Sequence, residues 1–71
     1  MSQQRFLTLP DVAEILSISV PQARAMVRSG ELPAIQVGGR GQWRVEKIKL
    51  EEYIQRGYER TQQAVREGTL H

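Results

Sequence analysis

The sequence predicts a mainly α fold with one small β-hairpin, and three observations lead to this prediction. Two helix start signals, at Thr8 and at Ser19, each precede apolar residues at helical spacing. A glycine-rich segment, residues 38–41, separates two short runs in which apolar and polar residues alternate. A further apolar stripe at helical spacing begins at Leu50. The expected order is therefore two helices, a hairpin and a third helix.

Length, composition and charge limit what the chain can be. With 71 residues it has room for one small domain, and it contains no cysteine, which excludes disulfides and thiolate metal sites. It shows no signal-peptide pattern and no apolar run of membrane-spanning length, so we expect a soluble, cytoplasmic protein. Residues 18–45 carry four arginines and one acidic residue. Any basic surface is therefore expected in the middle of the chain.

The first helix is expected to begin after Thr8. Asp11 stands three residues after Thr8, as in a capping box, and Pro10 fits the first turn of a helix. At about 100° per residue, the apolar residues are expected to share one side of an amphipathic helix of about two turns. These residues are Leu9, Val12, Ala13, Ile15 and Leu16.

The second helix is expected to run from Ser19 to Gly30. Ser19 and Gln22 form a second capping-box pattern, and Gly30 is a typical C-terminal stop. Only two residues separate the two helices, which is typical of a helix-turn-helix, a motif that binds DNA or protein. The core side is expected to carry Ala23, Met26 and Val27. The outward face is short and basic, with Pro21, Arg24, Ala25 and Arg28.

Residues 34–37 and 42–45 are expected to pair as a hairpin, with positive φ angles supplied by Gly38, Gly39 and Gly41. A hairpin that follows a helix-turn-helix forms a wing, so the predicted fold is a winged helix-turn-helix. The tip carries Arg40, and a compact basic tip suits contact with a phosphate backbone or a minor groove. Arg40 and Arg44 are therefore the candidate ligand contacts of the wing.

The single tryptophan, Trp43, has two interpretations. It is either a platform on which a base stacks or a packing anchor that ties the wing to the helices. We favour the packing anchor, because large aromatic side chains dominate the energetics of small cores.

The run from Phe6 to about Ile54 resembles the small MerR-like, excisionase-type winged helix-turn-helix family. The segment FLTLPDVAEIL resembles the opening helix of that family, SISVPQARAMVRSGELPA its recognition helix and the following turn, and GGRGQWRV with LEEYI its wing and closing helix. In that family the second helix lies in the major groove, and the wing touches the flanking backbone or minor groove. The resemblance implies groove contacts from Ser19, Pro21, Gln22, Arg24, Ala25 and Arg28, and wing contacts from Arg40 and Arg44.

A third helix is expected to pack over the first two through Leu50, Tyr53, Ile54, Gly57 and Tyr58. Ile48 falls almost opposite this stripe. It either precedes the helix, which we favour, or offers an apolar contact to another protomer. The expected organisation is an N-terminal arm at residues 1–5, a winged helix-turn-helix DNA-binding domain at 6–57, and a C-terminal segment at 58–71. That segment is a helical extension, an oligomer contact or a flexible tail.

These features lead to the hypothesis of a sequence-selective protein that binds double-stranded DNA. It is expected to be a bacterial or phage transcriptional regulator that binds cooperatively, in several copies. Two alternatives are an excisionase-like architectural factor in site-specific recombination and a protein-protein adaptor. No catalytic constellation is present, because there is no cysteine, the only histidine is terminal, and the adjacent Glu51 and Glu52 point in different directions on a helix. We therefore expect no enzymatic activity, no cofactor and no metal site.

Overall fold

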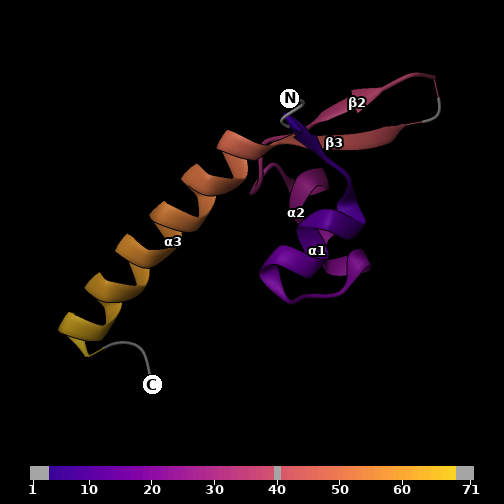
Figure 1. Ribbon diagram of the computed structural model, residues 1–71. Coiled ribbons are helices and arrows are strands. Elements are labelled where there is room, and N and C mark those ends of the chain that lie inside the picture. Colours follow the sequence, from indigo (N-terminus) through magenta and orange to yellow (C-terminus); the bar gives the residue numbers. More distant parts are fainter. Residues whose placement is uncertain (1–3, 40, 69–71) are drawn as a thin grey trace.

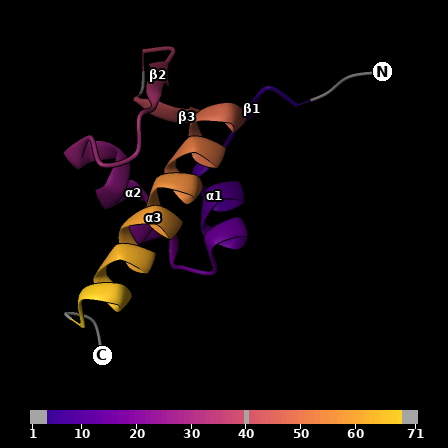
Figure 2. The ribbon, with the colours of Figure 1, turned by 90° about the vertical axis from the view of Figure 1, so that its left-hand side faces the viewer.

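The computed structural model describes residues 4–39 and 41–68 of the 71-residue chain. This part contains three helices and a three-stranded antiparallel sheet (Figure 1). The two short helices lie beside the sheet, and the third helix leaves the end of the sheet and extends away from them (Figures 1 and 2). In chain order the elements are β1 (Phe6–Leu7), α1 (Leu9–Leu16), α2 (Val20–Ser29), β2 (Ile35–Val37), β3 (Gln42–Glu46) and α3 (Lys47–Glu67). The winged helix-turn-helix predicted from the sequence is therefore confirmed.

Both predicted capping boxes are present. The Thr8 hydroxyl accepts a 3.2 Å hydrogen bond from the Asp11 amide, and the Asp11 carboxylate accepts one of 3.0 Å from the Thr8 amide. At α2, the Ser19 hydroxyl accepts from the Gln22 amide at 3.2 Å. The Gln22 side-chain oxygen accepts from the Ser19 amide at 3.3 Å. Between the helices Ser17 adopts a left-handed φ of 57°, which turns the chain sharply from α1 into α2.

The sheet has one more strand than the hairpin predicted from the sequence. β3 lies in the centre, with β1 on one edge and β2 on the other. The register of β1 is Phe6↔Glu46 and Leu7↔Val45, and that of β2 is Ile35↔Arg44, Gln36↔Trp43 and Val37↔Gln42. Directly before β1, the Arg5 carbonyl accepts a 2.8 Å hydrogen bond from the Lys47 amide. The N-terminal segment is thereby tied to the start of α3.

The hairpin turn needs glycine at two of the three predicted positions. Gly38 and Gly41 have φ angles of 75° and 66°, whereas Gly39 does not have a positive φ, so that prediction is wrong. At Gly41 a Cβ atom would lie 3.1 Å from the Gln36 side-chain nitrogen, but Gln36 is exposed and can shift by a few tenths of an ångström, so the positive φ is what favours glycine here. Arg40, the predicted tip cation, lies outside the described residues.

The core lies between α1, α2, the sheet and the first turns of α3. Its buried residues are Leu7, Leu9, Val12, Ala13, Ala23, Val27, Leu32, Val45 and Leu50. Trp43 and Met26 are partly buried against this core, in agreement with the packing interpretation of the tryptophan. Ile15 was expected on the core side but is 50% exposed. It lies about 60° beyond Val12 around the helix, outside the stripe that α1 buries.

α3 is longer than the body that it packs against. Leu50 is buried, and Tyr53 and Ile54 are partly buried against the core, whereas Tyr58 is 61% exposed. The helix then continues to Glu67 (Figure 1). Ile48 lies inside α3 and is 58% exposed, so the favoured interpretation, that it precedes the helix, is wrong.

Candidate nucleic-acid interface

The outward face of α2 is the most basic exposed surface of the helix-turn-helix. Ala23 and Val27 point into the core, so Arg24 and Arg28, one turn apart, are exposed on the other side. Among the residues that the structure describes, neither arginine forms an ion pair or a hydrogen bond. Pro21 and Ala25 are exposed on the same face. Two guanidinium groups that have no counter-ion among the described residues are suited to bind phosphate or the edge of guanine.

Two other predicted contact residues, Ser19 and Gln22, stabilise the N-terminus of α2. Both are exposed, but the Ser19 hydroxyl and the Gln22 side-chain oxygen form the capping box of α2. The Gln22 amide nitrogen donates to no described residue. Gln22 can therefore offer a donor to a ligand while it keeps the cap, whereas Ser19 contributes chiefly by placing the N-terminus of α2.

Arg44 is positioned differently from the α2 arginines. Because side chains alternate along β3, Arg44 projects from the face opposite to Val45, which is buried in the core. The Arg44 guanidinium donates to the Trp43 carbonyl at 2.8 Å and to the Gln42 side-chain oxygen at 3.4 Å. The side chain is partly buried and held close to the base of the wing.

A hollow of about 330 Å³ joins the wing to the helices. Arg24 from α2 and Arg44 from β3 both line it, together with Gln42 and the start of α1 at residues 8–10. The structure therefore brings together two predicted contacts from separate elements. Gln42 was not selected from the sequence, where it was interpreted only as part of an alternating strand. Its place beside the glycine turn was the available signal.

Of the two arginines in this hollow, Arg24 of α2 is more available to an anionic ligand than Arg44 of β3. The pKa of the Asp11 carboxyl is lowered, first by the hydrogen bond from the Thr8 backbone, then by the Thr8 side chain, and also by the charge of Arg44. The charge of Arg44 is the smallest of these effects, and no ion pair joins Arg44 to Asp11 among the described residues. No comparable carboxylate interaction is found for Arg24 in the described part of the chain. Arg24 is exposed and makes no hydrogen bond to a described residue, whereas Arg44 makes two, so Arg24 is the better placed of the two for an anionic ligand.

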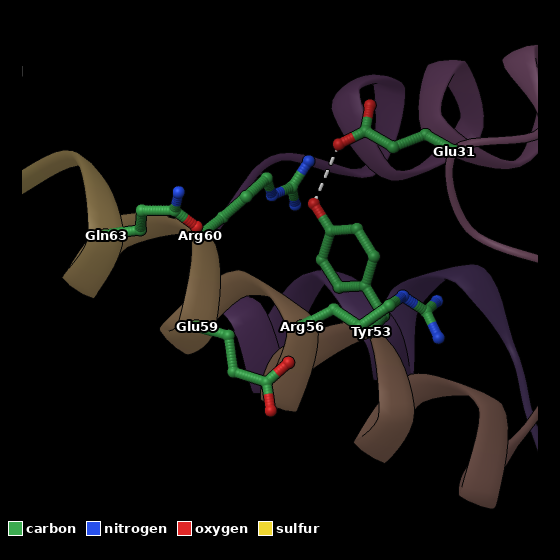
Figure 3. A pocket seen from close by; sticks show the side chains of 6 residues that line it. All are labelled: Glu31, Tyr53, Arg56, Glu59, Arg60 and Gln63. Atoms are coloured by element: carbon green, nitrogen blue, oxygen red, sulfur yellow. Dashed lines mark hydrogen bonds between the residues drawn. The ribbon is translucent and has the colours of Figure 1, made fainter.

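A second hollow, of about 390 Å³, lies between α3 and the segment that follows α2 (Figure 3). The Tyr53 hydroxyl donates a 2.8 Å hydrogen bond to the Glu31 carboxylate there. This bond is the main reason why the pKa of Tyr53 is raised, and partial burial raises it further. Arg56 and Arg60 line the same hollow beside two glutamates, so its charges balance. It supports the position of α2 and offers no excess of positive charge to a nucleic acid.

Across residues 4–39 and 41–68, no group of three or more histidine, cysteine, aspartate or glutamate side chains is arranged to hold a metal ion. None of the described helices is both long enough and apolar enough to span a membrane.

Comparison with known proteins gives one match. A family model described as a helix-turn-helix domain matches residues 6–58, which include both short helices, the sheet and the first half of α3. No curated protein and no solved structure matches the chain. A helix-turn-helix domain suggests DNA binding, in agreement with the two exposed arginines on α2. The chain belongs to the helix-turn-helix domain family, and it folds as a winged member of that class.

Proposed function

We propose that the protein is a sequence-selective double-stranded DNA-binding protein of the MerR-like, excisionase-type group, which regulates transcription in a bacterium or phage. The observation that carries this proposal is the pair of exposed arginines on α2, Arg24 and Arg28, neither of which has a counter-ion among the described residues. Helix-turn-helix membership supports DNA as the ligand. The proposed activity is binding alone, without a catalytic step.

In the proposed complex, α2 lies in the major groove and the wing lies on the flanking backbone or minor groove. Pro21 and Ala25 have short side chains, which allow the helix to approach the base edges closely. The donors for bases and phosphates on α2 are Gln22, Arg24 and Arg28, with Ser19 at the positive N-terminus of the helix. Arg40 and Arg44 would contact the backbone beside this groove. With so few base-reading side chains, part of the specificity is proposed to come from DNA shape.

One protomer is expected to bind weakly. Each phosphate that an arginine neutralises contributes about −0.9 to the slope of log K against log salt, and this surface offers about four arginines. We therefore propose that several copies bind cooperatively on repeated sites. At saturation, a strictly one-to-one complex on a long operator would contradict cooperative binding.

The test is selection and sequencing of genomic DNA fragments bound by the pure protein, followed by binding measurements across a salt series. Arg24→Ala is expected to blur the selected motif, whereas Arg40→Ala is expected to weaken all sites alike. Arg66→Ala provides a matched control, because it removes the same charge near the far end of α3. The DNA proposal fails if no fragment is enriched and Arg24→Ala behaves like Arg66→Ala. The search would then turn to protein partners and to the adaptor hypothesis.

A second candidate is an excisionase-like architectural factor that bends DNA at a recombination site. The small Pro21 and Ala25 side chains on the outward face of α2 favour it, because they read few base edges. Fluorescence energy transfer between the two ends of a selected site would measure bending. A large bend would favour the architectural role, and an unbent site would favour the regulator.

A further inference from the structure

Three polar side chains share the outer face of β3. Side chains alternate along a strand, so Gln42, Arg44 and Glu46 project from the face opposite to the buried Val45. The residues that pair with these three across the sheet have apolar side chains, which offer no hydrogen-bond acceptor. They are Val37, Ile35 and Phe6. On this face Arg44 therefore has an acceptor side chain on each side along the strand, Gln42 towards the wing and Glu46 towards α3.

Arg44 bonds to only one of these two neighbours. Its guanidinium donates to the Gln42 side-chain oxygen at 3.4 Å and to the Trp43 carbonyl at 2.8 Å. No ion pair or hydrogen bond joins Arg44 to Glu46 among the described residues, although a carboxylate is the stronger acceptor for a guanidinium. The Arg44 guanidinium therefore lies towards Gln42, at the hollow that Arg24 also lines.

The Glu46 carboxylate is bound by another arginine, Arg5. The Nε and Nη2 atoms of Arg5 donate to the same Glu46 carboxylate oxygen, at 3.1 Å and 2.9 Å. The Arg5 carbonyl accepts a hydrogen bond from the Lys47 amide, which keeps Arg5 beside the end of β3. The guanidinium of Arg5 also lies over the Phe6 ring, 5.5 Å from the ring centroid. Arg5 thereby offsets the one carboxylate that could draw Arg44 away from the wing.

We propose that Gln42 and Arg5 are positioning residues for a DNA contact made by Arg44. Gln42 holds the Arg44 guanidinium at the hollow, and Arg5 keeps Glu46 from competing for it. Only some of the N–H donors of Arg44 are used in its two hydrogen bonds, so the others remain available for a phosphate. A side chain that is ordered before binding loses less entropy in the complex. The inference rests on the proposed DNA-binding function, but the order of Arg44 can be measured without DNA.

The first experiment therefore uses the protein alone. Nuclear magnetic relaxation of the arginine Nε–Hε groups is expected to show that Arg44 is more ordered than Arg24, which forms no hydrogen bond in the described part of the chain. Gln42→Met removes the acceptor and keeps the length of the side chain, so it should lower the order of Arg44. Gln36→Met is the matched control, because Gln36 pairs with Trp43 and lies on the other face of the sheet. Equal order of the two arginines in the wild type would overturn the proposal.

The second experiment measures binding to a DNA fragment that the wild type selects, across a salt series. Arg44→Met is expected to reduce the slope of log K against log salt by about 0.9, the value for one phosphate contact. Gln42→Met should weaken binding by about threefold to tenfold. Where Arg44 is already replaced, Gln42→Met should have no further effect, because its contribution depends on Arg44. An equal loss in both backgrounds would show that Gln42 contacts DNA itself and would overturn its positioning role.

A third set of variants tests Arg5 on the same fragment. Arg5→Met is expected to weaken binding by about twofold to fivefold, because the released Glu46 carboxylate then pairs with Arg44. Addition of Glu46→Gln should restore most of this loss, whereas Glu46→Gln alone should change binding much less. Lys47→Met removes the same charge from an exposed neighbouring position, and Glu46→Gln should not rescue it. An equal gain from Glu46→Gln in all backgrounds would reflect net charge alone and would overturn the role of Arg5.

These outcomes separate the positioning of Arg44 from the proposed function. A protein that selects a DNA motif but holds Arg44 no more rigidly than Arg24 would overturn the positioning role alone. A protein with an ordered Arg44 that enriches no DNA fragment would overturn the DNA-binding function instead.

Discussion

The Tyr53 hydroxyl on α3 donates a 2.8 Å hydrogen bond to the Glu31 carboxylate, just beyond the end of α2 (Figure 3). Glu31 lies between Gly30, which ends α2, and Leu32, which is fully buried in the core. The bond therefore joins α3 to the point at which α2 is anchored. It holds the C-terminal end of α2 while the Ser19 cap orders the N-terminal end.

Tyr53→Phe tests this connection, because it keeps the ring and removes the donor. We expect the free energy of unfolding to fall by about 0.5 to 1.5 kcal/mol, towards the lower limit because the Glu31 end of the bond is exposed to water. Urea unfolding at neutral pH provides the measurement. Tyr58→Phe is the matched control, because Tyr58 is exposed. Equal losses in the two variants would show that the hydrogen bond does not stabilise the fold.

The same bond predicts a dependence of stability on alkaline pH. The hydrogen bond to Glu31 raises the pKa of Tyr53 above 10.0, and partial burial adds to this effect. The folded protein therefore holds the phenolic proton more tightly than the unfolded chain does. The stabilisation is complete below the unfolded pKa of about 10 and is lost as the pH rises through the folded pKa. Wild-type protein is expected to lose more stability than Tyr53→Phe between about pH 8 and about pH 11. Urea unfolding across this range measures the difference, and parallel curves would contradict the prediction.

At α1 the stability of the fold is expected to depend on pH in the opposite direction. Hydrogen bonds from Thr8, first from its backbone and then from its side chain, lower the pKa of Asp11 below 3.8. The stabilisation is present above the unfolded value and is lost as the pH falls through the folded pKa. Asp11→Asn should therefore be less stable than wild type at neutral pH, and the difference should shrink below about pH 3. Chemical unfolding at both pH values tests this, with Glu14→Gln as an exposed control on the same helix.

Replacement of glycine by alanine is expected to change the folding stability in opposite directions at two positions. Gly30 ends α2 with a φ of 84°, so Gly30→Ala is expected to cost about 1 kcal/mol of folding free energy. Gly57 lies inside α3, and a Cβ there would meet nothing within 4 Å. Gly57→Ala is therefore expected to stabilise the fold by about 0.5 to 1 kcal/mol. Thermal unfolding of both variants at low protein concentration compares them, and a change of the same sign in both would contradict the assignment.

The helices could be predicted from the sequence because their boundaries depend on local contacts. Thr8 with Asp11 and Ser19 with Gln22 cap each helix across three residues, and Gly30 ends α2 through its own φ. The wing could be predicted for a similar reason, because alternation and glycine are both local signals. The two exposed arginines of α2 follow from helical spacing once Ala23 and Val27 are assigned to the core.

By itself, then, the sequence determined the order of helices and hairpin and the basic outward face of α2. Only the tertiary structure decided the contacts between distant residues. β1 has two residues, too few for a pattern, and it exists because Phe6 and Leu7 pair with β3. The burial of Leu32, the hollow that Arg24 and Arg44 both line and the Tyr53–Glu31 bond likewise depend on how separate elements pack. Local periodicity reports which face of an element is apolar, but it cannot report which distant residue that face will meet.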